Sequence, residues 1–596
     1  MSREACNTNE PEREAGDANN NPSDSSANLG LARLWISQCI QHHELCRLGN
    51  SSTQPGLLPT RLINVHDRSQ PFLQVMKGEV LEPYLALSYR WGEGMMGQAL
   101  KSTNEAYQRC LPLNDIPRTC WDAIQVTRMI GYKYLWIDAF CIIQDDEADK
   151  SRELLKMGEI YRHALFTIYA KGSSSSQSGL FSRKESCISQ ARRMQVCATI
   201  PLVDQGTETA EATLAGAFDG KDYLEERGWV LQESVLSSRR LAFGNWMSWK
   251  CTMARATETR PVLWARHNAE TNGFAGEVEK LRMWIFAPAR MREAPRQSWL
   301  RWNQFNSWYA VVEIYSTTNL TYVSDNLPAL SGLAQLLQQT YRASYAAGLW
   351  LEDLQVGLTW YVASNDERKM PWRGDMAPSW SWAAVGKVRI RFRSWPSQST
   401  HVTSEGLELL EASCEPEIPL NPYGGIKKGT LKVRIRLRKA LLRYKPEYTP
   451  GRFKYDSISG SDYPLFSNVD EREQPQFPGL ILDMELNHVI GEAALDTPIH
   501  LSQRLADSLD VSCMIESNPP ASSEKEVWCG LVHVQETKER HQLTALVLEP
   551  VSDSLLVYRR LGLLFLTDQS WFGLSPSGPS ILREVSDVLM DVIELI

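Results

Sequence analysis

The chain has 596 residues, of which 43% are hydrophobic and 22% are charged, an ordinary balance for a globular protein. This length exceeds what one hydrophobic core supports and predicts two to four domains. The formal net charge of −8 argues against a nucleic-acid partner, because phosphate binding requires clustered positive charge.

The first thirty residues are polar and lack the apolar run of a signal peptide. No uninterrupted apolar stretch of about 18 residues occurs, so the sequence predicts no membrane span. The 12 cysteines are scattered along the chain and are expected to be reduced thiols, many of them buried. These features predict a cytoplasmic protein with a disordered tail at residues 1–28.

An amphipathic helix is predicted from Leu31 onward. Within it, Cys39, His42 or His43, and Cys46 fall on one helix face. This spacing would let a helix present three zinc ligands, but a closed structural site needs a fourth ligand that the spacing does not identify. The sequence therefore favours a buried face of cysteine and histidine and predicts no metal.

Strands and helices alternate from residue 59 to residue 170, which predicts an α/β fold with a doubly wound parallel sheet flanked by helices. Pro117 is expected to begin one helix that ends at Gly131, and Asp149 is expected to cap the next. The run 134–142 is apolar apart from one aspartate, as in a buried parallel strand. Strands are predicted at 59–65, 84–89, 134–142 and 165–170.

A flexible serine-rich segment, KGSSSSQSG at residues 171–179, is expected to follow the last of these strands, and loops or small hairpins should continue to residue 225. The α/β domain is predicted at 29–250, a helical Trp-rich region at 251–386, and a β-rich region at 387–596. In the β-rich region, the runs KVRIRFR and LKVRIRLRK place Lys and Arg at alternate positions. Such strands usually present a solvated face or protect a sheet edge.

In an open α/β sheet, ligands bind beyond the carboxyl ends of the strands, where the strand order reverses. Ser88, Tyr89 and Arg90 end one predicted strand, and Asp138 lies near the end of its expected neighbour. We therefore take these four as candidate cofactor-binding residues. A carboxylate there could bind a ribose hydroxyl or a cation. The alternative is that Asp138 caps a turn or pairs with Arg90.

Glu233 is the candidate catalytic residue. It follows Trp229 by one helical turn, so the two share a helix face and could line one pocket. A glutamate beside an indole is partly desolvated, which raises its pKa and suits acid–base chemistry or the stabilisation of an oxocarbenium ion. The alternative is a salt bridge with Arg227, Arg239 or Arg240.

Five blocks of this sequence resemble, in order, the fungal heterokaryon incompatibility (HET) domain. They are LPTRLINV, YLALSYRWG, IPRTCWDAIQVTRMIGYKYLWIDAFCIIQDDEADK, MGEIYRHALFTIYA and LEERGWVLQESVLSSRRLAFG. The resemblance implies a role in non-self recognition, in which some members of the family trigger growth arrest and cell death. Some relatives lie near secondary-metabolite genes, so an accessory role in such a cluster is an alternative.

The HET domain is in turn similar to TIR domains, which implies a flavodoxin-like sheet. In TIR domains a W-x-x-x-E element supplies the glutamate that cleaves the glycosidic bond of NAD. This resemblance implies that Glu233 would stabilise the ribosyl oxocarbenium ion and that Trp229 would stack on the nicotinamide. On this alternative NAD is a substrate and self-association activates the chain. On the first interpretation the chain uses no cofactor and acts through protein partners.

Overall fold

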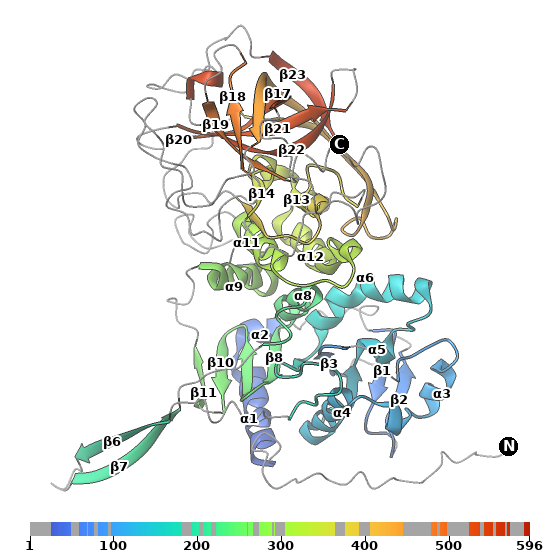
Figure 1. Cartoon of the computed structure of the whole chain (residues 1–596). Helices are drawn as coiled ribbons and strands as arrows, with labels where there is room; N and C mark the ends of the chain where they lie inside the picture. The colour runs from blue at the N-terminus through green and yellow to red at the C-terminus, as the bar shows by residue number, and fades with distance from the viewer. Residues whose placement is uncertain are drawn as a thin grey trace, which may run out of the picture. The chain divides into compact units, whose positions relative to one another are not determined.

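The structure is a computed structural model that divides into two compact units, Met1–Arg301 and Trp302–Ile596, whose elements are labelled in Figure 1. It describes residues 26–48, 59–67, 69–76, 82–92, 97–181, 193–201, 207–215, 222–258, 260–265, 273–288, 291, 304–363, 376–392, 406–444, 478–484, 489–496, 524–536, 541–551, 556–566, 569–572 and 589–596. Apart from residues 26–28, the predicted disordered tail lies outside the described residues.

The first unit is built on a nine-stranded mixed sheet in the order β11-β10-β9-β8-β5-β3-β4-β1-β2. Its four central strands are parallel, and numbered along the chain they lie in the order 2-1-3-4, which is the flavodoxin-like order. The predicted α/β class with a parallel sheet is confirmed. The four strands are β3 (Tyr84–Ser88), β4 (Tyr134–Trp136), β5 (Thr167–Tyr169) and β8 (Arg239–Phe243).

Antiparallel strands complete both sides of the sheet. The hairpin of the last two strands continues the sheet to Ala265, so the boundary predicted at residue 250 falls inside it. These strands escape prediction because ARAT and RPVLWA carry arginine or proline, which suit an edge more than a buried strand. The added strands are β1 (Arg61–Asn64), β2 (Phe72–Val75), β9 (Met247–Cys251), β10 (Ala254–Thr257) and β11 (Arg260–Ala265).

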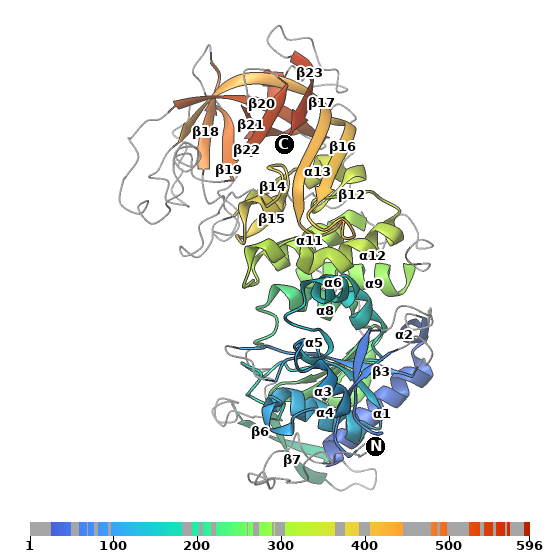
Figure 2. The same ribbon diagram turned by 90° about the vertical axis from the view of Figure 1, so that its right-hand side faces the viewer.

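Helices cover both faces of this sheet (Figures 1 and 2). On one face α1 (Ser26–His42) packs on α4 (Arg118–Ile130), and on the other α6 (Glu147–His163) packs on α8 (Gly228–Leu236). Behind α8 lies α9 (Gly273–Phe286). As predicted, α4 ends at Gly131, whose φ of 96° suits glycine.

The end of strand β4 and the cap of helix α6 differ from the prediction. The strand predicted at 134–142 ends at Trp136, and the chain turns at once into the short helix α5 (Asp138–Cys141). An apolar run alone does not distinguish a buried strand from a buried helical turn. Likewise α6 is capped by Asp146, whose side chain accepts from the amides of residues 148 and 149, and Asp149 faces inward.

The serine-rich segment 171–179 is held in place by α4. Ser173 and Ser176 are buried, and Thr119 donates its backbone amide to the carbonyl of Ser176 at 2.9 Å. The same threonine accepts from the amide of Gly179 through its hydroxyl at 3.1 Å. Its composition predicted flexibility, but the ends of helix α4 and strand β5 supply partners for its polar groups. Beyond it, the predicted hairpin forms from β6 (Arg193–Pro201) and β7 (Thr207–Ala215).

The second unit combines helices with a β-rich part, as predicted. Its largest sheet has eight strands, and the pairing of β20 with β17 closes this sheet on itself. The helices are α11 (Gln304–Ser316), α12 (Ser331–Tyr341) and α13 (Leu354–Gly357); the sheet strands are β16 (Glu408–Pro416), β17 (Ile426–Tyr444), β18 (Pro478–Leu482), β19 (Val489–Leu495), β20 (Glu524–Glu536), β21 (His541–Pro550), β22 (Val557–Leu566) and β23 (Leu589–Leu595).

The Lys and Arg side chains of the two basic runs differ in their exposure. In β17 the run LKVRIRLRK alternates buried aliphatic residues with exposed or half-buried Lys and Arg, as predicted, although this strand is paired on both sides. In KVRIRFR, by contrast, Arg391 is buried and forms a 2.9 Å ion pair with Glu313 of α11. The solvated face predicted for that run is wrong at this position, because a buried carboxylate from a helix satisfies the arginine. Among the described residues, no helix has the length and apolarity that crossing a bilayer requires.

Candidate functional site

Helix α8 brings Glu233 to the carboxyl end of the central strand β3. The chain reaches α8 after β5 and leaves it into β8, so this helix packs over the parallel strands on the face that α6 also covers. Glu233 lies in the last turns of α8, and its closest polar neighbours include Ser88, the last residue of β3. This is the edge at which the order of the parallel strands reverses.

Glu233 is a buried carboxyl group with a strongly raised pKa. Its side chain is 5% exposed. Burial raises its pKa to about 7, and the negative charge of Asp138 acts in the same direction. Ser88, Arg227 and Tyr161 oppose this shift but do not cancel it. Within the described residues, neither Glu233 Oε2 nor the buried Ser88 Oγ has a hydrogen-bond partner of ordinary geometry. The carboxyl therefore retains unused hydrogen-bonding capacity.

The alternative considered for Glu233, a salt bridge with Arg227, Arg239 or Arg240, does not form in the described part of the chain. Arg240 instead donates to Ser234 Oγ at 2.6 Å, and Arg239 turns to the opposite side of its strand to bond the carbonyls of residues 46 and 165. Arg227, which precedes α8, donates from Nη1 to the carbonyl of Tyr89 at 2.6 Å. Its charge lowers the pKa values of Glu233 and Asp138 without pairing with either.

Asp138 follows β4 and is engaged at both carboxylate oxygens. Oδ2 accepts from the indole of Trp91 at 2.8 Å, and Oδ1 accepts from the amide of Ala139 at 2.7 Å. Burial raises its pKa, and the Trp91 hydrogen bond and the charge of Arg227 act against that rise. Asp138 thus connects the first turn of α5 to Trp91 in the loop after β3. The arginine that acts on it is Arg227 rather than Arg90.

A second helix, α6, also brings an aromatic residue to Glu233. Tyr161 of α6 is 2% exposed, donates its hydroxyl to the carbonyl of Leu87 at 3.1 Å, and interacts with the carboxyl of Glu233. Trp229 is half-buried, and so is Arg90. Buried Tyr89 packs beside Asp138, and burial followed by that charge raises its pKa well above the ordinary value.

The structure therefore brings Ser88, Tyr89, Asp138 and Glu233 together and adds two residues, Tyr161 and Arg227. A carboxyl group with a pKa near neutrality can exchange a proton or, when ionised, stabilise a developing positive charge. In this structure the carboxyl of Glu233 is almost fully buried, so a ligand reaches it only if the residues that bury it move. Nothing in the sequence links Tyr161 to Glu233.

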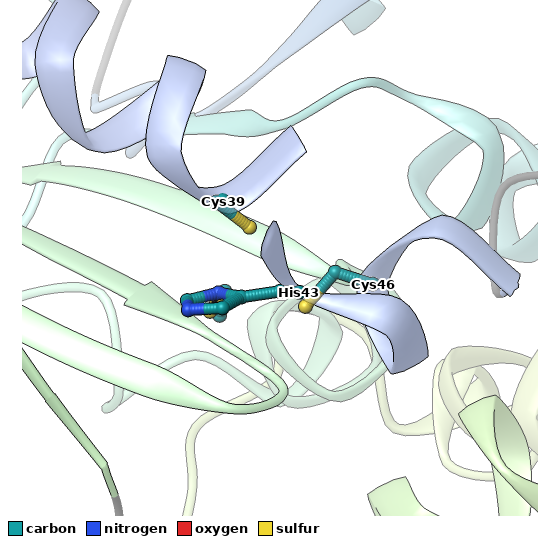
Figure 3. Close-up of side chains that lie close together, drawn as sticks. Cys39, His43 and Cys46 are labelled. Atoms are coloured by element: carbon teal, nitrogen blue, oxygen red, sulfur yellow. Dashed lines mark hydrogen bonds between the residues drawn. The ribbon is translucent and has the colours of Figure 1, made fainter. Parts of the chain in front are cut away.

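The cysteine and histidine residues noted in the sequence also come together. Figure 3 shows Cys39, His43 and Cys46 close to one another, and Cys251 of β9 joins them. The helix predicted to carry all three is broken at His43, so Cys46 lies on a second short helix, α2 (Glu44–Leu48). His42 is exposed, which makes His43 the histidine of this cluster.

These features define an α/β domain with a flavodoxin-like strand order and a buried acidic group at the point where that order reverses. Residues 84–233 match the family model described as "Heterokaryon incompatibility protein (HET)". The match begins at the first residue of β3 and ends at Glu233, so over this stretch the chain is similar to the HET domain family. Comparisons with curated proteins and with solved structures found no match.

Proposed function

We propose that this chain is a heterokaryon incompatibility factor that causes growth arrest or cell death through its HET domain. The observation that carries the proposal is the family match, because it covers three of the four parallel strands together with the acidic group at their carboxyl ends. The trigger is a protein partner of non-self or regulatory type. We assign its recognition to the residues after 250, since the HET match ends before them.

The test is inducible expression of the full chain in a fungal host. We expect growth arrest on induction of the wild type and none with Ile168→Asp, which places a charge at a fully buried position of β5 and prevents the sheet from forming. The variant Glu225→Gln, at an exposed position before α8, serves as the matched control and should arrest growth like the wild type. Full accumulation of folded wild-type chain without an effect on growth would contradict the proposal.

A second function, NAD hydrolysis, is favoured by one observation. Glu233 is a buried carboxyl with a pKa near 7 at the point where the strand order reverses, and within the described residues its Oε2 atom has no hydrogen-bond partner of ordinary geometry. In the reaction, the bond between the ribose and nicotinamide breaks, and nicotinamide leaves with the bonding electrons. Ionised Glu233 stabilises the positive charge left on the ribose, and water then adds and releases a proton to solvent. Because Glu233 is covered in the described state, this activity requires a rearrangement, for which self-association is our proposed cause.

NAD consumption by the full-length chain at high protein concentration tests this second function. Loss of NAD with the wild type and with Glu225→Gln, but not with Glu233→Gln, is the expected result. The wild type and the same two variants are then compared in the growth assay. If Glu233→Gln still arrests growth and the wild type consumes no NAD, the HET domain acts by binding and the enzymatic function is rejected.

A further inference from the structure

A compact group of three cysteines and one histidine lies where the N-terminal helices meet the sheet. Cys39 lies near the end of α1, His43 in the break after it, and Cys46 on α2. The fourth residue, Cys251, is the last residue of β9, about two hundred positions later in the chain. The group therefore joins two segments that lie on opposite sides of the HET match in the sequence.

The geometry of the group is close to that of a tetrahedral metal site. The three Sγ atoms and one imidazole nitrogen all lie within 4.8 Å of one another, and Cys251 Sγ is 3.3 Å from His43 Nδ1. With metal–sulfur bonds of about 2.3 Å, the ligand atoms of a tetrahedral zinc site are about 3.7 Å apart. Side-chain adjustments of about 1 Å would be enough to close the widest pair.

The surroundings supply the partners that thiolate ligands need. Cys39, Cys46 and Cys251 are fully buried, and His43 is half-buried. The amide of Ala254 donates to Cys251 Sγ at 3.2 Å, and Arg239 Nε donates to Cys39 Sγ at 3.3 Å. Three thiolates around a divalent ion leave one net negative charge.

The positive charge of buried Arg239 balances that remaining negative charge. Its Nη2 atom also donates to the carbonyl of Cys46 at 2.7 Å, so the same side chain fixes the backbone of one ligand and the sulfur of another. Outer partners of this kind orient ligands and tune their affinity for the metal.

A disulfide is the competing explanation for this group. A disulfide would use two of the three thiols and leave the third thiol and the histidine unexplained. The three cysteines are free thiols in the structure. Cysteine-rich groups with a histidine ligand in reducing compartments are typical of structural zinc.

We propose that Cys39, His43, Cys46 and Cys251 bind one structural Zn²⁺ ion in a closed Cys₃His site. All four positions of the ion are filled by protein ligands, so no position is open for a substrate. The ion would attach α1 and α2 to strand β9 and so stabilise this side of the sheet. This proposal does not depend on the proposed function of the HET domain.

The first measurement is the metal content of the full-length chain, purified without chelators and without a histidine tag from cells supplied with Zn²⁺. We expect one zinc ion per chain in the wild type and in two matched controls, His42→Asn and Cys110→Ser, which lie in the same unit outside the group. Cys251→Ser and His43→Asn should lose most of it. Equal zinc in all five proteins, or none in the wild type, would overturn the proposal.

The second measurement identifies the ligands even if those variants fold poorly. Co²⁺ alone is added to the zinc-free wild type and to His43→Cys, which keeps four ligands but changes nitrogen to sulfur. Both should show the intense visible bands of tetrahedral cobalt, and those of His43→Cys should lie at longer wavelength. Identical spectra would remove His43 from the site, and an intact mass that is two hydrogens short would indicate a disulfide instead.

Discussion

Glu233 is the residue whose environment departs most from what its side chain prefers. An exposed glutamate titrates near 4.5, whereas this one titrates near 7 because burial disfavours its ionised form. The folded protein therefore keeps a proton that the unfolded chain releases. Ionising the buried group costs the folded state about 3 kcal/mol, since one pKa unit corresponds to about 1.4 kcal/mol. This carboxyl lies at the end of the central strand β3, and groups with strongly shifted pKa values are common at functional sites.

The raised pKa predicts a pH dependence of stability that a single substitution removes. The contribution of Glu233 is fully present below pH 4.5 and is lost as the pH rises through about 7. Relative to Glu233→Gln, the wild type should therefore lose about 2–3 kcal/mol of unfolding free energy between about pH 5 and about pH 8. Urea unfolding of both proteins at the two pH values measures this. Exposed Glu225→Gln should show no such difference, and a pH-independent gap for Glu233→Gln would refute the raised pKa.

The sequence identifies Glu233 through its spacing from Trp229, but it does not identify the environment of the carboxyl. Tyr161 reaches it from α6, and Arg227 acts on it while bonding the end of β3. These neighbours belong to segments that only the folded sheet brings together. The spacing therefore locates the acid, whereas Tyr161 and Arg227 reach it only through tertiary packing.

At the scale of elements, a buried ion pair fixes the start of α6 against strand β1. Arg61 is 6% exposed and pairs with Asp149, which is 2% exposed. The Nε atom of Arg61 also donates to the carbonyl of Cys141 at 2.8 Å. The same carboxylate accepts from the amide of Ile143 at 2.9 Å. Burial would raise the pKa of Asp149, but these hydrogen bonds outweigh it and lower the pKa.

Removing one member of this pair should cost much more than removing both. Asp149→Ala leaves the guanidinium of Arg61 buried without its carboxylate, so the unfolding free energy should fall by about 3–5 kcal/mol. The double variant Arg61→Met with Asp149→Leu should recover at least about half of that loss. Glu147→Ala, in the same helical turn but exposed, should cost under about 1 kcal/mol. Urea unfolding measures all three, and a double variant as unstable as the single one would argue against an uncompensated charge.

Periodicity predicts the elements that have one buried face and clear ends. Helix α4 begins after Pro117 and ends at Gly131, as predicted, and it buries Cys120 and Ile124. Periodicity fails where an element is apolar on all sides, as in the run that changes from β4 to α5. It also fails where a polar segment finds its partners elsewhere, as the serine-rich segment does on α4.

At the scale of the whole molecule, the class of each unit can be predicted, but not the outer strands of the first sheet or the closure of the second. The β-rich character of the second unit follows from alternating runs, yet the pairing of β17 with β20 depends on register between segments far apart in the chain. In the first unit, the parallel core follows from strand and helix alternation. The antiparallel strands that complete it come from edge sequences with weak patterns.

The stretch that identifies the family is smaller than the sheet to which it belongs. Residues 84–233 include β3, β4 and β5 but omit β8, which pairs with β5, and β1, which pairs with β4. A fragment cut at these limits would leave both outer strands of its parallel core with unpaired backbone groups, an arrangement that promotes aggregation. The family match and the complete sheet thus have different boundaries. A shortened protein should instead end beyond the antiparallel strands that pair with each side of the parallel core.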